Sequence, residues 1–446
     1  MNHLQITKQI SFRFLLMIAF LSSCKNENKK ESFSYNANSL LKAQQNLTDC
    51  IVQDLLTPPF ASRVYAYSQV AAYEALQPAF PEYKNLKGIS NGLDSMPDVD
   101  SKKNINYELA AITAFNKVGE KLVWSEFIIE DWQNNYVDSL RKTGLSDEVV
   151  KNSTEWGSSV AGAILKWALK DNFKNTRKLT RYSLSDTTGA WQLTPPAYAP
   201  PIEPYWGTHR TFLLKSIDQF VPLVPPQYSK DPNSDYYKAL KEVYDVSKTL
   251  NDDQKNISSF WDCNPNVAHF SGHMTYYAQK MTPGGHWLAI AGNIIKDKNI
   301  DLMKASQTLT YTSMVIADAF IVCWNAKYKY NTIRPITVIN DWFDPNWFSY
   351  IQTPPFPEYP SGHSTISGAA STVLTKMLGD NIAFTDSTEL PYDLPVFSFK
   401  SFNEAADQVS ISRVYGGIHF RFACDNGLKL GREIGNYYNE ILPVAK

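Results

Sequence analysis

The amino-acid sequence predicts an all-α fold made of two helical bundles. Apolar residues recur at helical spacing along most of the chain, and few segments show the period-two alternation of strands. Residues 172–232 interrupt this pattern with clustered prolines and interleaved aromatic residues. Because so many aromatics are unusual in a disordered linker, we expect this segment to dock on the helices that it connects. The predicted halves are an N-terminal helical half, 38–232, which includes this connecting loop, and a C-terminal bundle, 233–446.

The first residues have the features of a bacterial export signal. Positive charges precede an apolar run, Phe14–Phe20, that is short for a spanning helix. Leu21-Ser22-Ser23-Cys24 resembles a lipoprotein cleavage site, so residues 1–23 are predicted to be a lipoprotein signal peptide. An acylated Cys24 would then begin a flexible tether, 24–37, and provide the only membrane contact. We expect lipid anchoring at the cell envelope, in the periplasm or outer membrane. A plain secretory signal, cleaved without acylation, or an N-terminal anchor is the alternative.

Composition excludes some partners and leaves the state of the cysteines open. The formal net charge is -1, so no surface for nucleic acid is predicted. Four further cysteines are far apart in the sequence and match no metal-binding spacing such as C-x2-C. An exported protein can oxidise its cysteines, but buried free thiols are favoured over two disulfides. These cysteines are Cys50, Cys263, Cys323 and Cys424.

Local signals set the helix boundaries in the N-terminal half. Apolar residues from Leu40 to Leu56 follow helical spacing, and Pro58-Pro59 ends that helix before another begins at Phe60. Residues 86–105 are rich in Gly, Asn, Asp and Ser and are predicted to form a loop. Further helices of this half are predicted at about 106–122, 127–142 and 146–170.

The C-terminal half alternates apolar helices with loops. The predicted helix at 299–325 has an apolar run at its end that gives it a buried face, and it leads directly into Lys327. Residues 336–359, rich in Trp, Pro and Tyr, and residues 380–400 are predicted to be loops. The remaining helices are predicted at about 234–260, 364–377, 402–413 and 425–441.

Histidines ahead of this long helix raise the question of a metal site. His269 and His273 are four residues apart, and on a helix that spacing can seat a metal. A third ligand is not evident, and a Ser-Gly pair between them weakens a helix, so ordinary polar or pocket-rim histidines are favoured. His286 and Trp287 are expected to line or support a cavity rather than to carry chemistry.

Cations in the last third of the chain suit an oxyanion. Lys327 is expected near a helix end and Arg334 on the turn after it, because Pro335 cannot continue the helix. Lysine and arginine neutralise the oxygens of such an anion, and arginine does so with a planar fork of donors. Ser361-Gly362 opens the next helix, where backbone N–H groups and the helix dipole favour an anion.

The second half of the pattern adds two histidines. Arg413 and His419 are six apart, and Gly416-Gly417 between them must break the helix to bring both into one pocket. One histidine can bind the central atom of the anion while the other moves protons. We therefore expect the anion pocket in the C-terminal bundle, with His363 and His419 as its catalytic pair.

The spacing of these residues resembles a known superfamily signature. It reads K-x6-R-P, then P-S-G-H, then S-R-x5-H, and each position is present here in order, from Lys327 to His419. Type 2 phosphatidic acid phosphatases, bacterial acid phosphatases and vanadium-dependent haloperoxidases share it. The chain length, the lack of several spanning helices, and flanking sequence such as Cys323-Trp324-Asn325-Ala326 favour the haloperoxidases. The chain is most similar to exported bacterial iodo- and bromoperoxidases.

The resemblance implies a cofactor and a set of roles. Vanadate, V(V), would be bonded to His419, its metal ligand, and His363 would be the acid–base that helps peroxide enter. Hydrogen peroxide and halide would be the substrates, a hypohalous-acid equivalent would leave, and small organic acceptors could follow. The vanadate oxygens would be held by Lys327, Arg334, Ser361, Gly362 and Arg413.

Two further points follow from the resemblance. Trp324 and Phe356 match aromatic residues of the halide pocket, and the bacterial relatives favour iodide first and bromide second. Many members carry Asp four residues after the last histidine, where this chain has Ala423 and the next acidic residue is Asp425. The residue that orients His419 is therefore left open.

Two other functions use the same residues. In the acid phosphatases of the superfamily, the residue matching His419 is the nucleophile and the one matching His363 protonates the leaving group. A lipoprotein that only binds an oxyanion, without catalysis, is the second alternative.

Overall fold

The computed structural model describes residues 33–265 and 267–444, and its contacts group Tyr35–Lys446 as one unit. The predicted signal peptide, 1–23, the acylated Cys24 and most of the tether, 24–37, lie outside the described residues and stay predictions. The division into 38–232 and 233–446 also stays a prediction.

The N-terminal helices pack around α3. This helix begins with two prolines, which suit its first turn because their missing N–H groups have no partner there. Nearly every residue of α3 is buried, since α4 and α6 cover it on some sides and α11 on another. The helices of this half are α2 (Asn38–Gln53), α3 (Pro58–Leu76), α4 (Tyr107–Glu120), α5 (Phe127–Lys142) and α6 (Asp147–Ala168).

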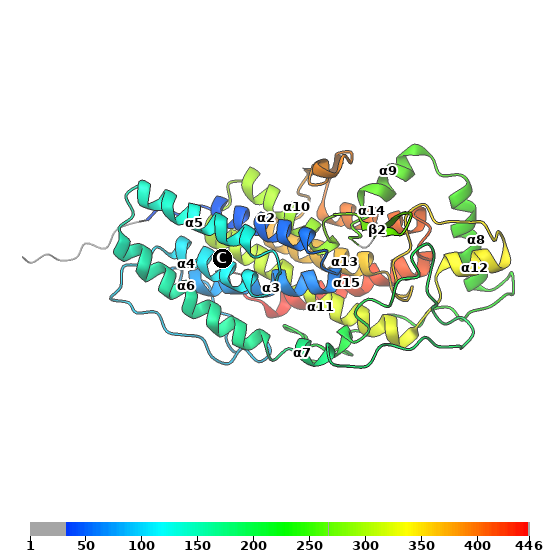
Figure 1. Cartoon of the computed structure of the whole chain (residues 1–446), viewed down its shortest axis with the longest axis horizontal. Helices are drawn as coiled ribbons and strands as arrows, with labels where there is room; N and C mark the ends of the chain where they lie inside the picture. The colour runs from blue at the N-terminus through cyan, green and yellow to red at the C-terminus, as the bar shows by residue number, and fades with distance from the viewer. Residues whose placement is uncertain (1–32, 266, 445–446) are drawn as a thin grey trace, which may run out of the picture. The chain divides into compact units, whose positions relative to one another are not determined.

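The C-terminal helices surround α11 and α13. Helix α11 packs on α3 as well as on α13, so it joins the two sets of helices (Figure 1). Helices α13 and α15 approach closely because Gly431 has no side chain; a Cβ there would lie 1.9 Å from Thr365 O. The helices are α8 (Asp235–Lys248), α9 (Asp252–Phe260), α10 (Pro283–Asp297), α11 (Leu302–Tyr330), α12 (Pro335–Trp342), α13 (Gly362–Leu378), α14 (Phe402–Tyr415) and α15 (Arg421–Ile441).

Helix α11 is also long and apolar enough to cross a membrane, judged by length and composition alone. Within its most apolar stretch, 94% of the residues are buried inside the protein. Its apolar surface therefore serves the core between the two sets of helices.

The connecting segment docks on α11, as predicted. The backbone N–H groups of Phe212, Leu213 and Leu214 donate to the carboxylate of Asp318, on α11, over 2.6 to 3.2 Å. A Cβ on Gly207 would lie only 2.7 Å from Asn325 Cα, so this segment and α11 are in close contact. Its regular elements are α7 (Phe173–Thr176) and η2 (Trp206–Thr208).

The fold is mostly helical, as predicted, and the described residues contain two short antiparallel hairpins. His269 lies in β1 and His273 in the turn after it, both exposed, so a helical metal pair at this place is wrong. The strands are β1 (Ala268–Ser271) paired with β2 (Met274–Tyr277), and β3 (Phe384–Asp386) paired with β4 (Phe397–Phe399); short 3₁₀ turns lie at η1 (Gln77–Ala79) and η3 (Leu390–Tyr392).

Two predicted boundaries are wrong. The predicted helix at 234–260 is two helices, because Asn251 forms a capping box with Gln254 and starts α9 afresh. The predicted loop at 336–359 begins with helix α12, since Pro335 occupies the first turn of a helix rather than ending one. Helix α12 packs against α8 (Figure 1).

Candidate active site

The signature side chains lie where four helix ends meet. Lys327 is in the last turn of α11, and Arg334 is the N-cap of α12, as the sequence predicts. Ser361 caps α13, and Arg413 is in the last turn of α14. His419 lies in the turn that follows, where Gly417 has a φ of 75°, so the predicted break between Arg413 and His419 is present.

These residues are close together and deeply buried. Arg334 Nη1 lies 3.2 Å from His419 Nε2. A Cβ on Gly362 would lie 3.9 Å from Lys327 Cε, so the turn at the start of α13 runs beside the lysine. Lys327, Arg334 and Arg413 are each 0% exposed. Burying three basic side chains near one another is costly, and a bound anion would offset that cost.

His419 is held in one tautomer by its two neighbours. Arginine is a donor only, so the contact from Arg334 Nη1 makes His419 Nε2 the nitrogen with the lone pair. Nδ1 of His419 then carries the proton and donates it to Glu358 Oε1 over 2.8 Å. The same carboxylate oxygen accepts the backbone N–H of Phe420 at 3.0 Å. Nε2 is thus presented to the space between the cations.

Backbone carbonyl groups accept hydrogen bonds from two of the cations, Lys327 and Arg334. Lys327 Nζ donates to Pro357 O and Glu358 O, both at 2.9 Å. Arg334 donates from Nε to Phe356 O at 3.0 Å and from Nη1 to Ile418 O at 2.8 Å. These carbonyls fix the positions of the charged groups without neutralising their charge.

Some buried polar atoms at this place have no protein partner. Arg334 Nη2, Arg413 Nη1 and His363 Nε2 lack a hydrogen bond to any part of the chain that the structure describes. A buried donor without a partner is costly, and two of these donors are charged. The other guanidinium nitrogens of Arg413 are occupied, Nε by Ser412 Oγ at 3.0 Å and Nη2 by Ser258 O at 3.3 Å. An oxyanion would supply acceptors for these nitrogen atoms.

Two aromatic rings border the cations. Lys327 Nζ lies 5.1 Å from the ring centre of Phe356 and 5.8 Å from that of Trp324. The two rings are 5.0 Å apart. Phe356 and His363 are only partly buried, whereas the three cations are fully buried.

Known proteins share both the sequence and the backbone of this region. A family model described as the VCPO second helical-bundle domain matches residues 307–442, which include every signature residue. The crystal structure of a bacterial vanadium-dependent iodoperoxidase is 42% identical and superposes with a TM-score of 0.88. The match covers 94% of this chain and 99% of that one. This chain belongs to the vanadium-dependent haloperoxidases.

More distant haloperoxidases share the fold. Holo-type and apo-type crystal structures of bacterial vanadium-dependent chloroperoxidase are 18% and 17% identical, with TM-scores of 0.70 and 0.63. The matches cover 92% and 86% of this chain, and 98% and 95% of those chains. None of the curated proteins matches this haloperoxidase sequence significantly.

Burial sets the protonation of this haloperoxidase site. It lowers the pKa of Lys327 to about 7, and Arg334 adds to the lowering. It raises the pKa of Glu358 to about 7, against the pull of Arg334 and Lys327. The pKa values of His363 and His419 are well below the usual range, first through burial and then through the nearby cations. Both imidazoles are therefore neutral at neutral pH.

Anion binding is expected to weaken as pH rises. A bound anion stabilises protonated Lys327 and raises its pKa, so above pH about 7 the free protein must take up a proton to bind. Ionisation of Glu358 adds a negative charge over the same range. We expect the affinity for sulfate, whose charge is constant here, to fall about tenfold between about pH 6 and pH 8.

Calorimetry of sulfate binding checks this expectation. Lys327→Met should lose most of the pH dependence, whereas Lys329→Met, which changes an exposed lysine on the same helix, should keep it. A constant affinity in the unchanged protein, or the whole pH dependence in Lys327→Met, would contradict it.

Sequence reasoning missed the residue that orients His419. Glu358 lies 61 positions before that histidine and is 0% exposed, and its only signal was its position just ahead of the P-S-G-H motif. Asp425, the nearest acidic residue after the motif, is exposed. The carboxylate that holds His419 therefore comes from the loop before α13.

His286 and Trp287 form hydrogen bonds with residues outside the signature, and His286 lies within electrostatic reach of His363. Trp287 Nε1 donates to Ser367 Oγ at 2.8 Å and so supports α13. His286 is bonded to Asp386, and neither residue has a hydrogen bond to the signature cations. The expectation of a supporting role fits Trp287.

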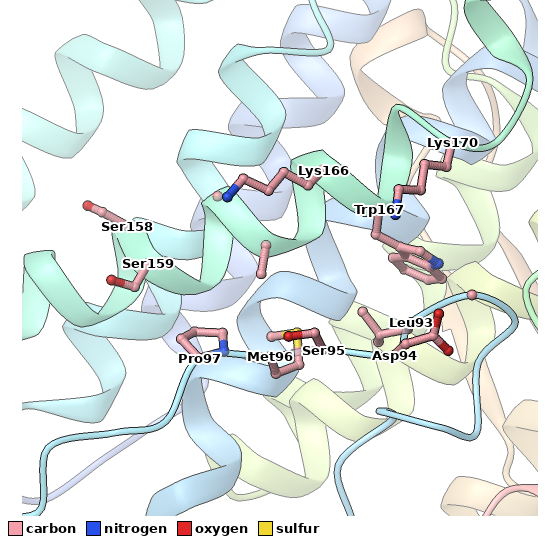
Figure 2. Close-up of a pocket in the computed structure, with 13 residues that line it drawn as sticks. Leu93, Asp94, Ser95, Met96, Pro97, Ser158, Ser159, Lys166, Trp167 and Lys170 are labelled. Atoms are coloured by element: carbon pink, nitrogen blue, oxygen red, sulfur yellow. The ribbon is translucent and has the colours of Figure 1, made fainter.

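The described surface has pockets away from the signature residues. One with a volume of about 630 Å³ lies between α6 and the loop that carries Asp94 to Pro97 (Figure 2). Lys166 and Trp167 of α6 and Lys170 just after that helix line it, and none of the signature residues does. An enclosed cavity among the signature side chains stays a prediction.

Proposed function

We propose that this haloperoxidase uses vanadate and hydrogen peroxide to oxidise iodide, and bromide less readily, to a hypohalous-acid equivalent. The observation that carries the proposal is the set of buried donors without a partner among the described residues: Arg334 Nη2, Arg413 Nη1 and His363 Nε2. All three residues are electrostatic neighbours of His419, whose Nε2 carries its lone pair toward Arg334 Nη1. This donor set fits a tetrahedral oxyanion.

Different residues of the chain would bind the vanadate oxygens and the vanadium atom. Arg334, Arg413 and protonated Lys327 offset the charge of the vanadate oxygens, and the first turn of α13, at Ser361 and Gly362, lies beside them. His419 offers Nε2 as the ligand atom. Burial keeps water away from the cations, which strengthens each interaction with an anion.

His363 suits proton transfer. Oxidation of a halide by peroxide to hypohalous acid consumes one proton, so the site needs a group that accepts and donates protons. His363 is neutral, and its buried Nε2 has no hydrogen bond to any described residue. When bound, vanadate would supply a Lewis-acidic V(V) centre that polarises peroxide, and vanadium would stay V(V) throughout.

Iodide is supported by two observations. The relative that shares 42% of its sequence over 94% of this chain is an iodoperoxidase. Trp324 and Phe356 place two polarisable rings beside Lys327, a setting that suits a large, weakly hydrated anion. Iodide is also the easiest halide to oxidise.

An assay of metal-stripped protein, with and without orthovanadate, tests the proposal. We expect vanadate to restore iodide oxidation by peroxide, bromide oxidation to be slower, and phosphate to compete with vanadate for the same donors. Hydrolysis of p-nitrophenyl phosphate without halide oxidation would instead favour an acid phosphatase with His419 as nucleophile. Oxyanion binding without either activity would mean a binding protein.

A further inference from the structure

A second cluster of buried reactive side chains lies outside the oxyanion site. Cys263 follows α9, His286 is in the first turn of α10, and Glu389 lies between β3 and η3. Their exposed fractions are 2%, 1% and 2%. One ligand atom from each lies within 4.8 Å of the other two. Three segments that are distant in sequence thus bring a thiol, an imidazole and a carboxylate together.

The hydrogen bonds of His286 direct one nitrogen into this cluster. Nε2 lies 2.8 Å from Asp386 Oδ2, and the other oxygen of that carboxylate accepts from the backbone and hydroxyl of Thr388. Asp386 can only accept, so Nε2 donates and Nδ1 faces Cys263 and Glu389. A carboxylate that holds the far nitrogen of a histidine is the usual support of a metal-binding histidine.

Glu389, on the Nδ1 side of His286, has a carboxylate oxygen without a hydrogen-bond partner among the described residues. Cys263 Sγ lies 3.2 Å from Nδ1, and Glu389 Oε1 lies 3.3 Å from Nδ1. Glu389 Oε1 has no hydrogen bond to any described residue. A lone pair on nitrogen facing a buried carboxylate oxygen is repulsive unless a cation lies between them. A proton or a metal ion can fill that role.

We propose that Cys263, His286 and Glu389 bind a divalent metal ion of the Zn²⁺ class. Sulfur, nitrogen and carboxylate oxygen together are the ligand types that Zn²⁺ accepts. Bonds of about 2.0 to 2.3 Å to a tetrahedral ion separate its ligand atoms by about 3.3 to 3.6 Å. Cys263 Sγ and Glu389 Oε1 lie 3.2 and 3.3 Å from His286 Nδ1, and all three atoms lie within 4.8 Å of one another. The fourth position is open to water or to the second oxygen of Glu389.

The ion would cross-link three segments. It would fix the end of α9 and the turn between β3 and η3 to the start of α10, whose Trp287 supports α13. This role is separate from vanadate chemistry, because the ligands differ and the oxyanion donors are cationic.

Titration with Co²⁺ alone tests the proposal. Chelator-treated full-length protein should develop the near-ultraviolet charge-transfer absorption of a cobalt–thiolate bond, saturate at a single equivalent, and lose the signal when Zn²⁺ is added. Cys263→Ser should abolish the absorption. Cys50→Ser, which changes another buried free cysteine, should keep it.

Two further variants keep the test decisive if Cys263→Ser fails to fold. Glu389→Gln should weaken Co²⁺ binding by about tenfold or more, and Asp386→Asn by about 10- to 100-fold. Circular dichroism shows whether each variant is folded, and Zn²⁺ should raise the melting temperature of the unchanged protein. Absence of the absorption in folded protein, or its persistence in Cys263→Ser, would overturn the proposal and leave a proton on His286.

Discussion

His419→Ala is expected to lose stable vanadate binding together with turnover. The substitution removes the nitrogen that the structure presents to the space between the cations and leaves Arg334 Nη1 and Glu358 Oε1 without their histidine partner. Vanadate binding measured by calorimetry and peroxide-dependent triiodide formation are the two readouts. Full activity in His419→Ala would overturn the assignment of this residue as the vanadium ligand.

His363→Ala should behave differently. His363 is bonded to none of the described residues that hold His419, so removing it should leave measurable vanadate affinity. Its proposed contribution is proton transfer, which is typically worth about 10² to 10⁴ in rate. Iodide oxidation should be the last activity to vanish. Equal loss of vanadate binding in the two histidine variants would contradict their separate roles.

Glu358→Ala is expected to lower vanadate affinity by about 10- to 100-fold. Without this carboxylate, His419 Nδ1 and the backbone N–H of Phe420 lose their acceptor inside the protein. The imidazole can then turn or change tautomer, and Nε2 no longer faces the anion in a fixed position. The vanadate dissociation constant and the pH profile of iodide oxidation measure the effect.

Matched substitutions separate this effect from a general loss of stability. Glu358→Gln keeps an oxygen that accepts both N–H groups, so it should retain more vanadate affinity than Glu358→Ala. Asp425→Asn removes an exposed carboxylate near the motif and should leave affinity unchanged. If Asp425→Asn weakened vanadate binding as much as Glu358→Ala, Glu358 would not be the orienting group.

Local sequence signals predicted most helices and the positions of Lys327 and Arg334 at helix ends. Helix starts depend on caps and prolines within a few residues, so α3, α13 and α14 are close to the predicted ranges. Cys50, Cys263, Cys323 and Cys424, whose pairing the sequence left open, are buried and free in the structure. The predicted helix boundaries were wrong where one residue type is compatible with two structures. Pro335, for example, can follow the end of a helix or occupy the first turn of the next one.

The amino-acid sequence by itself determined the all-α class and the order of the signature residues proposed to bind an oxyanion, because periodicity, caps and motif spacing are properties of neighbouring residues. Only the tertiary structure decided which groups meet. Glu358 orients His419 across 61 residues, and Asp386 holds His286 across 100. Helix packing and the need of buried polar groups for hydrogen bonds bring together residues this far apart in the sequence. The spacing of residues within a motif does not predict such pairs.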